Sequence, residues 1–173
     1  MALREILQFP DPRLKRVSEP VTEITEEIRE LARDMCEAMY DEPGIGLAAP
    51  QVGEALRLFV IDTEWNDEDT ERNAEVLINP EFIKKEGKTT WEEGCLSVPD
   101  YTAEVERASE VTVRALNLEG EEVTYECTGL KAICMQHEND HLDGILFIDR
   151  ISRLKRSLYV KKRKKKLAAE AAE

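Results

Sequence analysis

The sequence lacks any long apolar run, although 42% of its 173 residues are apolar. No stretch approaches the roughly 18 apolar residues that indicate a membrane-spanning helix, and the N-terminal residues lack the apolar core of a signal peptide. We therefore expect a cytoplasmic protein that does not contact a membrane. The length and apolar content are typical of one folded unit, and we expect a single domain over residues 1–173.

Cysteine is scarce as well. The four cysteines fall at irregular spacings in a chain with no export signal, so a disulfide framework is not expected. Each is predicted to be a core thiol or a metal ligand, and the four are Cys36, Cys95, Cys127 and Cys134.

Positive charge is in deficit. The chain carries 24 Lys and Arg against 37 Asp and Glu, a net charge of −13. Residues 151–173 nevertheless hold nine Lys or Arg and two Glu, a local balance of +7 that leaves −20 on the rest. So acidic a body repels nucleic-acid phosphates, which argues against DNA binding, while the basic segment could still dock on an RNA-rich surface.

Three segments have the signals of helices. Apolar residues from Ile28 to Met39 recur on one face of a first helix. Thr128 and Gly144 are suited to cap the two ends of a second helix. A third helical segment, near the C-terminus, is highly basic. The predicted helices span residues 25–41, 129–142 and about 151–168.

Strand signals lie on both sides of the middle helix. β-branched and aromatic residues predict strands at 56–63 and 75–83, and alternating residues predict an antiparallel hairpin over 109–127. The pattern favours an α+β fold, with antiparallel strands around a central helix, plus the C-terminal helix. Three further segments are predicted to be irregular: an extended surface leader at 9–20, a shaped glycine-containing loop at 44–53 and a solvated acidic loop at 64–73.

The sharpest local signal is an HExxH sequence in the middle helix. His137 and His141, the only histidines in the chain, are four residues apart and therefore share one helix face, where both rings can reach one metal ion. Glu138 lies about 100° further round the helix, so it can act as a base without being a ligand. The structural alternative is a chance pair of histidines.

The rest of that helix face is apolar, which predicts that it points into the protein. Two buried histidines would need other hydrogen-bonding partners if no metal were present. Catalytic metal sites commonly have three protein ligands, and a cysteine, an aspartate or a glutamate elsewhere could supply the third. Cys95 in the segment EEGCLSVP is one candidate, because turn residues flank it.

Three motifs together resemble one family. The segments GIGLAAPQVG (44–53), EGCLS (93–97) and QHENDHLDG (136–144) are similar to the signature motifs of peptide deformylases and occur in the family's order. The resemblance implies a hydrolase that removes the N-formyl group from N-formylmethionyl nascent peptides and releases formate. It also implies the roles of six residues: Cys95, His137 and His141 as metal ligands, Glu138 as general acid and base, and Gln51 with the Leu96 backbone N–H as stabilisers of the oxyanion.

The resemblance also favours a substrate pocket and a cofactor. A Cys-His-His set accepts Zn²⁺, Ni²⁺ or Co²⁺, and the family points to one Fe²⁺ per chain. The glycine-containing loop would let a peptide pair with it as an added strand, although a tight structural turn is the alternative. The expected substrate-binding residues, which could equally be ordinary core, are Ile45, Gly46, Gly94, Leu130, Ile133 and Cys134. Trp65 and Trp91 are assigned no role.

Two other functions compete with this interpretation. An HExxH zinc endopeptidase would use the same water activation, but none of the third-ligand motifs familiar in proteases follows His141. A non-catalytic, metal-stabilised binding protein would need a fourth protein ligand, and none is obvious. The basic segment is either a solvated helix face or a contact with the ribosome, and we expect a monomer.

Overall fold

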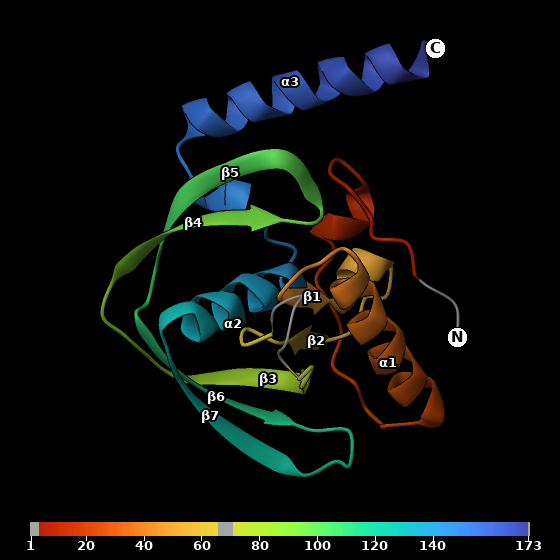
Figure 1. Cartoon of the computed structure of the whole chain (residues 1–173), viewed down its shortest axis with the longest axis vertical. Coiled ribbons are helices and arrows are strands. Elements are labelled where there is room, and N and C mark those ends of the chain that lie inside the picture. Colours follow the sequence, from red (N-terminus) through yellow and green to blue (C-terminus); the bar gives the residue numbers. More distant parts are fainter. Residues whose placement is uncertain (1–3, 66–70, 173) are drawn as a thin grey trace.

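The structure is a computed structural model that describes residues 4–65 and 71–172 (Figure 1). Helices α1 (Glu26–Asp41), α2 (Gly129–Leu142) and α3 (Arg153–Ala171) confirm the three predicted helices. Residues 66–70 of the predicted acidic loop lie outside the described residues. Across the described ranges, no helix combines the length and the apolar character that a membrane crossing requires.

The strands form two antiparallel sheets, which confirms the α+β class. Figure 1 shows α2 between the two sheets, with α3 beyond β5. The larger sheet has the order β1-β2-β3-β6-β7 and the smaller one pairs β4 with β5. Their bounds are β1 (Gly46–Ala48), β2 (Leu58–Ile61), β3 (Glu75–Glu86), β4 (Thr89–Cys95), β5 (Val98–Arg107), β6 (Glu110–Leu116) and β7 (Glu122–Thr128).

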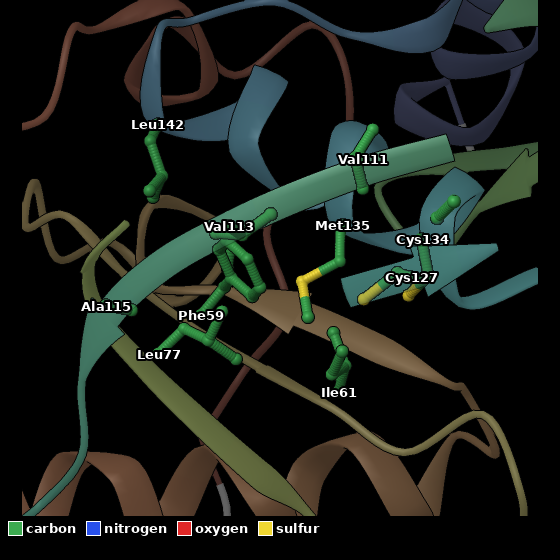
Figure 2. Close-up of a cluster of buried hydrophobic side chains, with 12 residues drawn as sticks. Phe59, Ile61, Leu77, Val111, Val113, Ala115, Cys127, Cys134, Met135 and Leu142 are labelled. Carbon is green, nitrogen blue, oxygen red and sulfur yellow. The ribbon is translucent and has the colours of Figure 1, made fainter. Parts of the chain in front are cut away.

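Helix α2 is buried because it packs on both sides. Met135 points toward Phe59 and Ile61 of the larger sheet (Figure 2), and all three side chains are inaccessible to solvent. Each such side chain contributes about 1.5–3 kcal/mol by leaving water. The opposite face, with His137 and His141, points toward the smaller sheet, and this packing holds both rings on a rigid element.

The prediction of an extended surface leader at 9–20 is wrong. Phe9 and Leu14 are buried, and residues Pro12–Lys15 form a short 3-10 helix that the Asp11 side chain caps. The segment before it reaches the site, because the Leu7 N–H donates to the Gln51 carbonyl and the Phe9 N–H to the Ser97 carbonyl, both at 2.7 Å. The surface path was predicted from the prolines alone. The apolar residues that anchor this segment are isolated in sequence, so they form no periodic pattern that would have predicted their burial.

The predicted irregular loop at 44–53 contains regular structure. Its middle forms β1, which pairs with β2, and Ala49–Val52 form a 3-10 helix. The glycine content hid the strand. Gly46 is required within it, since a Cβ atom there would lie 2.6 Å from Oε2 of Glu138 and 2.9 Å from Sγ of Cys134.

The β4–β5 hairpin was not predicted. Its strands contain Gly94 and Pro99, which weaken a strand pattern, and most β4 side chains are exposed. Its turn brings Cys95 opposite Val98. Cys95 therefore ends a strand beside α2, which is how a residue 42 positions from His137 reaches the same site.

Candidate metal centre and active site

Three side chains converge on one point. Ligand atoms of Cys95, His137 and His141 all lie within 4.8 Å of one another, and Cys95 Sγ is 3.4 Å from His141 Nε2. Tetrahedral bonds of the usual Zn–S and Zn–N lengths place such a pair about 3.5 Å apart. One thiolate and two imidazoles are donors that suit a divalent transition metal, so the residues fit the metal that the motifs imply.

Glu93 fixes the His137 ring. Its Oε1 atom lies 2.8 Å from His137 Nδ1, and both side chains are buried. A carboxylate accepts the Nδ1 proton and so leaves the Nε2 lone pair for a metal. Burial alone would raise the pKa of Glu93, but hydrogen bonds from Arg107 and His137 hold it below its usual value.

Glu93 belongs to a charge network that is buried except at Arg150. Arg107 donates to both Glu93 oxygens at 2.8 Å and to Oδ2 of Asp140 at 2.5 Å. Asp140 also accepts from Arg150 at 2.6 and 2.7 Å. This alternation of charge keeps four ionic groups satisfied behind the histidines. The network had no sequence signal beyond the presence of Glu93 and Asp140 inside two motifs.

Glu138 faces the same centre without joining the ligands. Its Oε2 atom is 3.9 Å from His137 Nε2, and its buried Oε1 atom has no hydrogen-bond partner among the described residues. Burial raises the pKa of this carboxyl to about 7. A divalent cation beside it would lower that pKa, so the group is suited to exchange a proton near neutral pH.

Gln51 and Leu96 lie beside Cys95 and line the same cavity as Glu138. The Gln51 amide oxygen accepts from the Ala48 N–H at 2.9 Å, and its Nε2 donates to Ser97 Oγ at 3.0 Å and to Cys95 Sγ at 3.6 Å. These bonds orient the amide so that its nitrogen faces Ser97 and Cys95. Leu96 follows Cys95 in the β4–β5 turn.

A cavity of about 400 Å³ opens beside these groups. It is lined by eleven of the twelve residues singled out from the sequence, and His141 lies deeper, 1% exposed. Sequence reasoning missed Trp91, which is 44% exposed at the cavity, and gave no role to Pro43. The eleven are Ile45, Gly46, Gln51, Gly94, Cys95, Leu96, Leu130, Ile133, Cys134, His137 and Glu138.

One edge of the cavity is an open strand edge. The Asp62 N–H donates to the Ile45 carbonyl at 2.9 Å, and Gly46 is the Cα partner of Ile61. Hydrogen bonds alternate along an antiparallel pair, so the Gly46 N–H and C=O point away from β2. Because β1 is the outermost strand of its sheet, these groups are available to an extended peptide.

Comparisons with known proteins all match one family. A family model described as polypeptide deformylase matches residues 3–157. A peptide deformylase from Afipia carboxidovorans is 54% identical over 98% of this chain and 100% of that protein. The crystal structure of a peptide deformylase from Legionella pneumophila is 42% identical over 99% of each chain, with a TM-score of 0.89. A peptide deformylase from Ehrlichia chaffeensis in complex with actinonin is 37% identical over 96% of this chain and 98% of that chain, with a TM-score of 0.88.

Proposed function

The chain belongs to the polypeptide deformylase family and removes the N-formyl group of nascent polypeptides, and we propose that Cys95, His137 and His141 hold its catalytic metal. The observation that carries this assignment is the convergence of their ligand atoms within 4.8 Å beside the cavity. When bound there, a divalent metal supplies a Lewis acid that lowers the pKa of water toward neutrality.

Glu138 is the proposed general base and acid. Its carboxylate takes a proton from the attacking water and then delivers it to the departing amine nitrogen, which releases formate and a free α-amino group. The formyl oxygen gains negative charge as the water adds. In this proposal the Gln51 side-chain N–H and the Leu96 backbone N–H donate to that oxygen, and both residues line the cavity.

The substrate lies along the Gly46 edge in this proposal. Its backbone pairs with the outward-facing N–H and C=O of Gly46, and Gly94 lines the cavity from the β4 side. The unbranched methionine side chain enters the apolar part of the cavity. That part is lined by Ile45, Leu130, Ile133 and Cys134.

We infer that Fe²⁺ is the physiological metal, with Zn²⁺, Ni²⁺ or Co²⁺ as replacements. A thiolate with two imidazoles binds all four, so occupancy depends on supply and oxidation rather than on affinity alone. Protein purified anaerobically and protein exposed to air can be compared by metal content and by activity. Loss of iron and activity together in air, with restoration by Fe²⁺ under nitrogen, is the expected result.

Release of formate from formyl-Met-Ala-Ser by the metal-loaded protein tests the function. The zinc endopeptidase alternative instead predicts cleavage of an internal peptide bond, which mass spectrometry of the products would reveal. A metal-stabilised binding protein predicts neither product. We expect formate and intact Met-Ala-Ser, from a chain that acts as a single-domain monomer.

Helix α3 provides the proposed contact with the ribosome. Lys161, Lys162 and Lys165 are exposed, whereas Tyr159 and Arg163 pack back onto the protein. The helix thus presents a basic face on an otherwise acidic body. Such a face attracts ribosomal RNA, because Lys side chains that contact phosphates release condensed counterions, which favours binding at low salt.

Charge reversal tests this contact better than truncation, since deletion of α3 would also remove the buried Tyr159 and Arg163. We expect K161E/K162E/K165E to weaken ribosome binding about tenfold or more and to reduce its salt dependence. Formate release from the short peptide should not change. K84E/K85E/K88E makes three like charge reversals on and just after β3, and an equal loss from that variant would contradict a specific role for α3.

A further inference from the structure

Trp65 contacts the substrate-binding edge from outside the cavity. Its indole Nε1–H donates to the Gly44 carbonyl oxygen at 3.0 Å. Gly44 lines the cavity two residues before Gly46, whose backbone is the proposed partner of the peptide. The tryptophan lies beyond β2 in sequence, and none of the three signature motifs includes it.

Asp62 holds the chain around Trp65 in place. This buried carboxylate accepts hydrogen bonds from the backbone N–H groups of Glu64 at 3.2 Å and Asn73 at 2.9 Å, so it anchors the backbone at both of these residues. It also accepts from the hydroxyl of Tyr40, on α1, at 2.5 Å. One buried side chain therefore joins α1 to the segment that carries Trp65.

The indole ring is packed as well as hydrogen-bonded. Tyr40 meets it edge-on, with ring centroids 4.9 Å apart and planes at 87°. The Arg72 guanidinium lies over both rings, 4.8 Å from the Tyr40 centroid and 5.3 Å from that of Trp65. Aromatic and cation–π contacts of this kind hold a ring in one orientation, so the N–H is aimed at Gly44 before substrate arrives.

Gly44 has little freedom on its other sides. Its N–H donates to the Met39 carbonyl at 2.6 Å, at the end of α1. A Cβ atom on Gly44 would lie only 3.0 Å from Leu96 Cδ1. The Trp65 bond therefore completes a set of constraints that fixes the start of the Ile45–Gly46 edge relative to the β4–β5 turn.

We propose that Trp65 is a positioning residue for the formyl-peptide, acting through the Gly44 carbonyl to hold the Ile45–Gly46 edge in register with Cys95 and Leu96. The inference rests on the proposed placement of the peptide along that edge. Trp65 touches no reacting group, so its contribution belongs to substrate binding. Because this hydrogen bond already holds the edge in place, less conformational entropy is lost when a peptide pairs with it.

Trp65→Phe separates the hydrogen bond from the ring, because phenylalanine keeps an aromatic face for Tyr40 and Arg72. We expect KM for formyl-Met-Ala-Ser to rise about fivefold, the effect of one hydrogen bond, with kcat within about twofold of wild type. Metal content and thermal unfolding should match wild type. Tyr125→Phe, which removes one polar atom from an aromatic residue on β7, is the matched control and should leave both constants unchanged.

Three results would overturn the proposal: an unchanged KM, a fall in kcat at constant KM, or a loss explained by lower metal content or lower unfolding temperature. Failure of the wild-type protein itself to release formate would instead refute the proposed function, and the two failures are therefore distinguishable. Trp65→Ala adds a graded check, because it removes the ring as well as the N–H. It should raise KM beyond the value for Trp65→Phe.

Discussion

Glu138→Gln is expected to lower kcat for formyl-Met-Ala-Ser by about 10²–10⁴-fold, the usual contribution of a general acid and base. Glutamine has nearly the same shape but cannot take up a proton from water. Gly46 leaves just enough space for the native side chain, so an isosteric replacement avoids a clash with β1. KM should change little, because in the proposed mechanism the carboxylate acts on the reacting water and not on the bound peptide.

Metal content separates this role from that of a ligand. Glu138 Oε2 is 3.9 Å from His137 Nε2, outside the converging ligand set, so Glu138→Gln should retain one metal per chain. Glu104→Gln, an exposed carboxylate on β5, provides the matched control and should behave as wild type. Loss of metal from Glu138→Gln, or activity close to wild type, would contradict the assignment.

The sequence predicted the elements whose signals are local. HExxH has helical spacing, and α2 carries it over the predicted residues because Gly144, with φ of 75°, ends the helix as expected. Thr128 stands at the predicted N-cap position of α2, but its side chain makes no capping hydrogen bond, whereas the Thr25 side chain caps α1 by accepting from the Ile28 N–H at 3.3 Å. The alternating residues of β6 and β7 likewise predicted their antiparallel pairing.

Features that depend on long-range packing left no such signal. Arg107 is indistinguishable in sequence from any exposed arginine, yet it is 5% exposed and holds Glu93 behind His137. Trp65 interrupts an acidic segment, and only the fold reveals that its N–H meets Gly44. The third metal ligand was identified as Cys95 only through the family resemblance, because the residue spacing alone left an aspartate or a glutamate equally possible.

The two kinds of feature meet at His137. The helix period places its ring on the correct face of α2, but the period does not determine which ring nitrogen carries the proton. That choice is made by Glu93, from a hairpin the sequence did not predict, and Glu93 is in turn oriented by Arg107. The chemistry of the centre therefore depends on a buried ion pair between β4 and β5 as much as on the motif.

Arg107→Met is expected to lower the free energy of unfolding by about 3–5 kcal/mol, the usual cost of removing one partner from a buried ion pair. Methionine fills much of the volume but leaves the buried Glu93 carboxylate without its bidentate partner, while Asp140 keeps Arg150. Chemical denaturation of the metal-loaded protein measures the loss. Arg114→Met, which removes an exposed pair with Glu81, should unfold nearly as wild type does.

The same substitution should weaken metal binding about 10–100-fold, as loss of a residue that orients a ligand commonly does. Without Arg107, Glu93 can take up a proton and cease to hold the His137 Nδ1–H, so the ring no longer presents Nε2 in a fixed direction. Competition with a chelator at a pH where the protein stays folded measures this effect separately from unfolding. Lower stability with unchanged metal affinity would show that Arg107 supports the hairpin alone and that His137 is oriented without it.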